Sequence, residues 1–553
     1  MYRMSSWKIV VSLCITVIAI LCGHRCLSLY TISRSFEEER TVVTNTKYSS
    51  YLTSINASDP KFYNILLEEE ALRYGPCVNE SYAASAKNSK VIISGGTKKE
   101  YQHGDVVVAS IIVYDGNGKR KFTGGDLFRA IVENKHLQAS APCVVYDNSD
   151  GTHTITFTAM WTGPLLLTVY LSYTREIVTF IYRLKSLKYP PYEILLGKFM
   201  NGHESESARC YPAEFTLEKI IKTKSYCHMT SKTYDMPYFC EKPLKQHLSC
   251  QNWTAAKLHR VRSMPTSPCE NSLIKRGQQK LEQVVYINVT RKKTDTGLYF
   301  TNEPLKRCSD YNLSLLWNTA TPSGFSLQNK WIYTRCQCLN ESLYKSCLTN
   351  KKIYLLGDST LRQWYYNIID RFKNRPSGRK VVHTQLSYFN KEYNTRVMWS
   401  PHSMPIFLLY QWTSLRDTLY SISRRIDNIP QEEHAVVVFQ LYMHMLRYHH
   451  SVFQRRMEII RNSVEKCLKR NKNIVFMIKS PHTFFEPTFD NLALGDYPGN
   501  VFSYILYEVF QGLHDKVVLL NNRDISLTYL NKNAHPSESI VNAMVNQMLC
   551  HAC

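Results

Sequence analysis

Apolar runs alternate with helix-like segments through residues 351–553, and this alternation restricts the possible fold more than any other feature of the chain. The apolar runs are short enough to be buried strands, and the segments between them repeat apolar residues every three or four positions. Such alternation is typical of a mostly parallel sheet covered by helices on both faces. Strands are predicted at 353–356, 436–439, 474–478 and 517–520, and helices near 360–372, 451–470, 500–513 and 537–549.

A serine follows the first predicted strand, in the stretch Gly357-Asp358-Ser359-Thr360. A helix that begins beside a serine hydroxyl supplies free N–H groups and a positive potential, which favour an oxyanion. A hydroxyl alone is a poor nucleophile and needs a base. His535 can be that base if both residues lie at the same edge of the sheet. Two interpretations stay open: an acyl-group enzyme if Ser359 and His535 meet, and a plain helix N-cap at Ser359 if they do not.

The N-terminal segment predicts the cellular compartment. Residues 7–23 are nearly all apolar, with Arg3 and Lys8 on the leading side. A run of this length fits either a cleaved signal peptide or a retained signal-anchor. We favour the anchor because the residues after the run do not form a small-residue cleavage site. The expected protein is single-pass and type II, with residues 1–6 as a cytoplasmic tail and its body in the lumen of the secretory pathway.

Cysteine usage points to an oxidising compartment. The chain has 17 cysteines, and ten of them lie from Cys143 to Cys347. This clustering predicts a disulfide framework. Cys336 and Cys338 have the spacing of half a metal site, but no Cys/His pair follows at zinc spacing, so we expect no metal. The N-glycosylation sequons all precede residue 350, at Asn56, Asn79, Asn252, Asn288, Asn312 and Asn340.

The net charge of +23 is spread over the whole chain. Residues 351–553 carry 25 basic and 16 acidic residues, and the rest of the chain holds the larger part of the excess. A nucleic-acid-binding protein more often concentrates its basic residues on one stripe or tail, so we expect no nucleic-acid partner. A diffuse basic surface favours anionic partners such as sialylated or sulfated glycans, and a merely soluble basic surface is the alternative.

The chain divides into regions of different character. Residues 24–79 are polar and resemble a stem. Residues 80–200 contain alternating, β-branched and aromatic segments separated by glycine turns, which predict an antiparallel, immunoglobulin-like β-sandwich. Residues 201–350 form a Cys-rich connecting region in which the secondary structure is hard to predict. Residues 351–553 form the α/β domain.

Four segments resemble the neurexophilin and PC-esterase domain (NXPE) family and occur in that family's order. In chain order they are a β-domain at 104–130, a segment before the esterase part at 325–331, a serine block at 354–364 and a C-terminus at 524–553. The resemblance implies a neurexophilin-like sandwich followed by an SGNH-hydrolase-like (PC-esterase) domain.

The resemblance also implies a function. Members of the family are linked to sialic acid O-acetylation on mucins, which implies a secreted or Golgi-membrane glycoprotein that acts as an O-acetyltransferase or acetylesterase. Ser359 would be the nucleophile and His535 the general base, with Gly357 and Asp358 forming the turn at the oxyanion hole. Acetyl-CoA is the expected acetyl donor, with no bound cofactor. The expected partners are sialylated or other anionic glycans, and the membrane through residues 7–23.

The chain departs from the family pattern at His535. The pattern places an Asp three residues before the His, to fix its tautomer and stabilise the imidazolium. Lys532 occupies that position here, and a nearby cation would oppose protonation of His535. Asp524 matches another aspartate of the family and is the candidate substitute.

A second departure lies at Tyr442 and Met443, where the family pattern has a Gly and an amide suited to an oxyanion hole. His444 remains and, with Arg362, is a candidate for substrate binding, although Arg362 can also be a solvated helical residue. These departures keep two further functions open. One is a catalytically degenerate protein that binds glycans, and the other is an interaction protein that acts through its sandwich.

Overall fold

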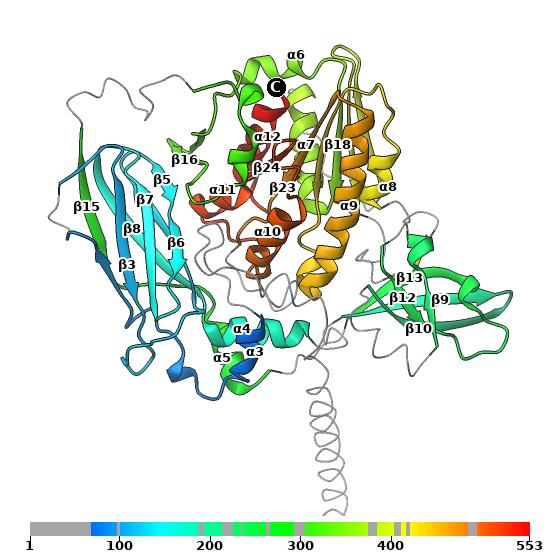
Figure 1. The fold of residues 1–553 in the computed structure, drawn as a ribbon, viewed down its shortest axis with the longest axis horizontal. Helices are drawn as coiled ribbons and strands as arrows, with labels where there is room; N and C mark the ends of the chain where they lie inside the picture. The colour runs from blue at the N-terminus through cyan, green and yellow to red at the C-terminus, as the bar shows by residue number, and fades with distance from the viewer. Residues whose placement is uncertain are drawn as a thin grey trace, which may run out of the picture.

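The computed structural model of the chain describes its residues in eleven ranges (Figure 1). These are 68–96, 100–186, 193–212, 225–233, 236–260, 266–291, 305–373, 384–402, 411–415, 421–484 and 495–553. The predicted tail and anchor at 1–6 and 7–23, and the Asn56 sequon, lie outside them. No helix within the described ranges combines the length and the apolar character that crossing a membrane requires.

A six-stranded sheet forms the centre of the C-terminal region, in the order β19-β20-β18-β22-β23-β24. All neighbours pair in parallel except β19 with β20. The chain passes from β18 to β20 on one side and then returns to β22 on the other side, so β18 ends at a topological switch point. The strands are β18 (Lys352–Gly357), β19 (Leu386–Asn390), β20 (Thr395–Pro401), β22 (Ala435–Gln440), β23 (Ile474–Lys479) and β24 (Val517–Leu520).

Helices cover both faces of this sheet (Figure 1). Val436 and Val438 of β22 pack on one side with α7 and α12, whereas Val437 and Phe439 pack on the other side with α9 and α10. The predicted alternation of parallel strands and covering helices is therefore confirmed. The helices are α7 (Ser359–Lys373), α8 (Ile422–Asp427), α9 (His450–Arg470), α10 (Pro498–Val509), α11 (Asn522–Thr528) and α12 (Glu538–Ala552).

Two further sheets pack face to face around a common apolar core, which makes a β-sandwich. Residues alternate between buried and less buried positions along β3 and β7, as one inward face requires. The smaller sheet has the order β1-β3-β7-β6 and the larger has β17-β16-β5-β4-β8-β15-β2, with β14 beside β8. The strands are β1 (Lys90–Ile93), β2 (Tyr101–Gln102), β3 (Val106–Ile112), β4 (Leu127–Asn134), β5 (Ala139–Pro142), β6 (Val144–Asp147), β7 (Thr152–Thr158), β8 (Gly163–Tyr173), β14 (Gln279–Lys280), β15 (Val285–Thr290), β16 (Gly324–Leu327) and β17 (Lys330–Tyr333).

The larger sheet of the sandwich thus takes strands from both 80–200 and 201–350. A fourth sheet, in the order β11-β12-β10-β9-β13-β21, takes four strands from 201–350, and its other two strands come from just before this region and from the α/β region. Two disulfides hold it together: Cys210–Cys240 joins β10 to β12, and Cys227–Cys250 joins β11 to the turn before β13. Its strands are β9 (Glu193–Asn201), β10 (Glu204–Tyr211), β11 (Tyr226–His228), β12 (Phe239–Glu241), β13 (Trp253–Arg260) and β21 (Thr413–Ser414).

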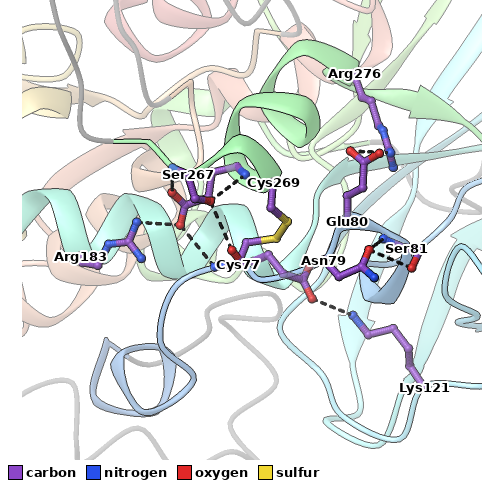
Figure 2. The surroundings of a disulfide bond; sticks show 11 residues. Cys77, Asn79, Glu80, Ser81, Lys121, Arg183, Ser267, Cys269 and Arg276 are labelled. Atoms are coloured by element: carbon purple, nitrogen blue, oxygen red, sulfur yellow. Dashed lines mark hydrogen bonds and ion pairs between the residues drawn. A yellow bond between two sulfur atoms is a disulfide. The ribbon is translucent and has the colours of Figure 1, made fainter. Parts of the chain in front are cut away.

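Disulfides connect segments that are distant in sequence, and the predicted framework is confirmed. Cys336 and Cys338 both belong to disulfides, which removes the alternative of a metal half-site there. Figure 2 shows the Cys77–Cys269 bond, where Ser267 donates a hydrogen bond to the carbonyl oxygen of Cys77. The other long-range bonds are Cys308–Cys336, Cys338–Cys550 and Cys347–Cys553.

A buried ion pair joins the sandwich to the α/β domain. Arg129 on β4 lies 2.6 Å from Asp496, and each side chain is 1% exposed. The Asp496 carboxylate also accepts hydrogen bonds from the Tyr173 hydroxyl at 2.8 Å and the Phe484 N–H at 3.0 Å. The two regions therefore share a polar contact that water does not reach.

The described sequon asparagines are accessible. Asn79, Asn288, Asn312 and Asn340 are exposed and Asn252 is half-buried. Their glycosylation stays a prediction.

Candidate active site

Ser359 and His535 meet in space. Ser359 is the first residue of α7, directly after β18, and His535 lies in the loop between α11 and α12. The Ser359 hydroxyl oxygen lies 2.6 Å from His535 Nε2, a short hydrogen-bond distance. A helix N-cap is therefore not the role of Ser359. Asp358 fills that position, because its carbonyl oxygen accepts from Leu361 N–H and its carboxylate accepts from Thr360 N–H.

Gly357 and Asp358 shape the turn that presents Ser359. A Cβ atom on Gly357 would lie 2.3 Å from the carbonyl oxygen of Gln440 on the neighbouring strand, so only glycine fits where β18 ends. Asp358 is 1% exposed, and its carboxylate joins the turn to the segment after β22. It accepts from the Thr360 hydroxyl at 2.6 Å and from the Met443 N–H at 3.1 Å. The turn is thus held by buried hydrogen bonds.

A buried lysine lies beneath this turn. Lys479, the last residue of β23, donates to the Thr360 hydroxyl at 3.0 Å and to Gln440 Oε1 at 2.9 Å. Burial lowers the pKa of the Lys479 ammonium to about 8, although the charge of Asp358 acts in the opposite direction. Burial alone would raise the pKa of the Asp358 carboxyl, but Lys479, His444 and the Thr360 bonds lower it below its ordinary value. Asp358 is therefore a carboxylate at neutral pH.

Three hydrogen bonds fix the loop that carries His535. Gln363 on α7 donates to the carbonyl oxygen of Pro536 at 2.9 Å. A ring nitrogen of His482 lies 2.9 Å from the carbonyl oxygen of Ala534. Asn531 Nδ2 donates to the carbonyl oxygen of Thr483 at 2.7 Å. The loop is therefore bound to α7 and to the segment after β23 on either side of His535.

The environment of His535 favours a neutral imidazole. Desolvation lowers its pKa, and the charges of Arg362 and Lys479 lower it further, whereas Asp358 raises it. Lys532 is exposed, and it is not among the charges that shift His535. The sequence analysis predicted that Lys532 opposes protonation of His535. That prediction is wrong, because the positive charges that oppose it are those of Arg362 and Lys479.

The suggestion that Asp524 replaces the missing carboxylate is also wrong. Its carboxylate accepts from the Ser323 N–H at 2.7 Å, the Ser323 hydroxyl at 2.9 Å and Asn521 Nδ2 at 2.8 Å. These bonds join α11 to the turn before β16, away from His535. Within the described residues, no carboxylate makes a hydrogen bond or ion pair with His535, so Ser359 and His535 form a dyad.

The segment after β22 does not offer Tyr442 or Met443 as hydrogen-bond donors to an oxyanion, because both already have partners within the protein. The Met443 N–H is used by Asp358, and the buried Tyr442 hydroxyl donates to the carbonyl oxygen of His482 at 2.9 Å. His444 Nδ1 lies 2.6 Å from His402 Nε2, so one ring donates and the other accepts. Desolvation, followed by the charge of His402, lowers the pKa of His444 well below its ordinary value. His444 also interacts electrostatically with His535, which places it at the site.

Arg362 lies beside the dyad, one turn along α7. Its guanidinium is 5.4 Å from the centre of the Trp399 ring, a cation–π contact that holds the side chain against β20. Its charge acts on His535, so Arg362 is part of the site rather than an uninvolved helical arginine.

Sequence reasoning missed Lys479, Gln440, Gln363 and His402. Lys479 had a visible signal, because a lone lysine ends an otherwise apolar strand. The other three had none, because their roles depend on contacts with residues at least 39 positions away.

Comparisons with known proteins agree with part of this description. Residues 331–553 match the family model described as "NXPE family member 4-like, C-terminal domain". Among solved structures, the chain matches an active-site mutant of a family two carbohydrate esterase from Clostridium thermocellum at 11% identity, covering 83% of this chain and 96% of that one, with a TM-score of 0.20. A family two carbohydrate esterase from Cellvibrio japonicus matches at 9% identity, covering 84% and 96%, with the same TM-score.

Proposed function

We propose that this chain, whose residues 331–553 match the NXPE family model, is an O-acetyltransferase or acetylesterase that uses Ser359 as nucleophile and His535 as base. The hydrogen bond between Ser359 and His535 is the observation that carries this proposal. The two residues are 176 positions apart in sequence, and the fold brings a hydroxyl and an imidazole to the end of β18. A nucleophile within hydrogen-bond reach of a base is the arrangement that acyl transfer requires.

The reaction has two steps. Ser359 Oγ attacks the acyl carbon while His535 Nε2 takes the serine proton, and the bond from the acyl carbon to the leaving group breaks as His535 gives that proton to the leaving group. An acceptor hydroxyl, or water in an esterase, then loses a proton to His535 and attacks the acyl-serine. His535 gives this proton to Ser359 as the serine leaves.

Two groups are placed to stabilise the oxyanion. The N–H of Ser359 lies at the first turn of α7, where the helix dipole is positive. His444 is the second donor if His402 donates to His444 Nδ1, because the neutral His444 ring then carries its proton on Nε2. In this proposal His444 takes the role of the amide that the family pattern has before it.

The proposed acceptor is a sialylated or other anionic glycan on a mucin, and the proposed donor is acetyl-CoA. Arg362 supports an anionic acceptor, because it is a cation beside the nucleophile that Trp399 holds in place. The proposed location is the lumen of the Golgi, through the signal-anchor at 7–23, or the secreted medium.

The missing carboxylate partner of His535 favours a second candidate function. Without a carboxylate, the imidazolium that forms during catalysis is less stabilised. The same site would then bind acylated glycans without turning them over. A serine-reactive probe distinguishes the two functions, because only an activated serine reacts.

A fluorophosphonate probe is expected to label wild-type protein at Ser359, as located by peptide mass spectrometry. Ser359→Ala and His535→Ala should lose the label. Ser537→Ala is the matched control, because Ser537 lies two residues from His535 and bonds to Ser539 instead. Folded wild-type protein that remains unlabelled would contradict the enzyme and favour the binding protein.

The hydrolysis of an aryl acetate should persist to lower pH than an ordinary histidine base allows. The base acts only when neutral, and a lowered pKa of His535 keeps it neutral below about pH 6.5. Arg362→Met removes one positive charge that lowers this pKa, so the acid limb of kcat/KM should move to higher pH. Lys532→Met is the control and should leave the limb in place. A limb that moves equally in both variants would show that the assignment of charges is wrong.

A further inference from the structure

A cluster of metal-ligating side chains lies where the N-terminal helix α3 (Glu68–Arg73) meets the start of α9. Glu68, His449 and His450 place their ligand atoms within 4.8 Å of one another. Glu68 is 381 residues from His449 in sequence, so the fold alone assembles the group. In Figure 1 α3 and the neighbouring α4 (Arg175–Lys185) lie at the lower end of α9. The cluster shares no residue with the Ser359–His535 dyad.

The spacing of these atoms matches the coordination of a small divalent cation. Glu68 Oε2 lies 3.0 Å from His449 Nε2 and 3.6 Å from His450 Nε2. Ligands bound tetrahedrally to Zn²⁺ at about 2.0–2.1 Å lie about 3.4 Å from each other. The two observed separations lie on either side of that value, so a zinc ion fits between the three ligands with small movements.

His450 lacks hydrogen bonds that a buried histidine needs. The residue is 7% exposed, its Nδ1 has no partner among the described residues, and its Nε2 lies beyond hydrogen-bond distance of Glu68. Burying an unpaired polar group is costly, and such groups in proteins commonly bind water or an ion. A metal bound at Nε2 would supply the missing partner.

Second contacts orient the other two ligands. The Ser186 hydroxyl donates to Glu68 Oε1 at 2.6 Å, which leaves Oε2 toward the histidines. The Ser451 N–H donates to His449 Nδ1, so a neutral His449 ring carries its proton on Nε2, the atom that faces Glu68. Zinc binds His449 Nε2 only in the other tautomer, so this proton must move to Nδ1, which then donates to Ser451 Oγ at 2.8 Å in place of the hydrogen bond from the Ser451 N–H.

Two features oppose a cation here. Lys185 is buried and interacts electrostatically with both Glu68 and His450. The start of α9 also carries the positive end of a helix dipole. Glu68 supplies the negative charge that offsets them.

We propose that Glu68, His449 and His450 form a zinc site that joins α3 to α9, with the fourth coordination position open to water. An N₂O ligand set suits Zn²⁺ better than Ca²⁺ or Mg²⁺, which prefer oxygen ligands. The sequence analysis predicted no metal. Glu68 is 381 residues from His449, so the three ligands do not form a spacing typical of zinc sites along the chain. The ion would fasten the N-terminal segment of the body to the α/β domain.

Zn²⁺ titration of the chelator-treated full chain, against a chromophoric competitor, tests the site. Wild type should bind one equivalent that Glu68→Gln and His450→Gln bind at least about 100-fold more weakly. His203→Gln, at an exposed histidine, should bind like wild type. Co²⁺ in place of Zn²⁺ should give the intense visible absorption of tetrahedral coordination, and Glu68→Gln should lose it.

Two outcomes overturn the proposal. One is no zinc uptake by wild type, and the other is unchanged uptake in Glu68→Gln, which keeps the side-chain shape and the Ser186 contact. Lys185→Met should raise the zinc affinity, because it removes the opposing charge. Unchanged affinity in that variant would place the ion elsewhere. If His450→Gln does not fold, Glu68→Gln and Lys185→Met carry the test.

Discussion

Replacing Ser359 with alanine is expected to lower the rate of acyl transfer at least about 10³-fold, which corresponds to about 4 kcal/mol of transition-state stabilisation. The reason is that no other hydroxyl is bonded to His535 in the described part of the chain. His535→Ala should cause a similar loss, because the serine then has no base. The double variant should be no worse than either single one, since the residues act as a unit. The measurement is the release of acetate from an acetylated glycan or an aryl acetate.

Folding must be kept separate from chemistry in this comparison. Ser359 is one of the less buried residues of its turn, and Asp358 rather than Ser359 caps α7, so Ser359→Ala should melt like wild type. Ser537→Ala should retain full activity. A Ser359→Ala protein with substantial activity would rule out the acyl-serine, and multiplicative losses in the double variant would show that the two residues act independently.

Asp496→Ala is expected to destabilise the protein by about 3–5 kcal/mol, because it leaves Arg129 charged and buried without its carboxylate. It also removes the acceptor for Tyr173 and Phe484. The first unfolding transition should fall by about 6 °C or more in a thermal melt. Arg129→Met combined with Asp496→Asn should recover much of this loss, since the buried Arg129 charge is then removed together with its partner.

An exposed ion pair provides the matched control for Asp496. Glu69 pairs with Arg73 at 2.7 Å, but their side chains are 60% and 71% exposed. Glu69→Ala should therefore leave the melting temperature unchanged, because solvent screens such pairs. Equal effects of Asp496→Ala and Glu69→Ala would mean that the sandwich and the α/β domain do not depend on their buried contact.

Much of the α/β domain could be predicted from sequence because each strand is a short apolar run. The runs at 353–356, 436–439, 474–478 and 517–520 all lie within observed strands. β20 was missed, since Thr395–Pro401 mixes polar, charged and apolar residues. The prediction also left strands out of the larger sheet of the sandwich, for a different reason. β15 and β16 come from a region far along the chain, and sequence patterns do not reveal which distant strands pair.

The candidate site was predicted in part. The pair Ser359 and His535 could be predicted because each lies beside a strong helix or strand signal at the sheet edge. The partner of His535 could not, since spacing along the chain led to Asp524, whose carboxylate instead binds Ser323. Lys532 was assigned an effect that belongs to Arg362 and Lys479, because charge proximity depends on the fold and not on a separation of three residues.

The account depends most directly on whether Ser359 changes the acylation of glycans. Mass spectrometry of glycans released from cells can compare sialic-acid O-acetylation with wild type, Ser359→Ala and an empty vector. We predict a change in O-acetylation with wild type alone, an increase for a transferase and a decrease for an esterase. The same O-acetylation in all three, with the protein folded and in the Golgi, would contradict the proposed sialic-acid enzyme.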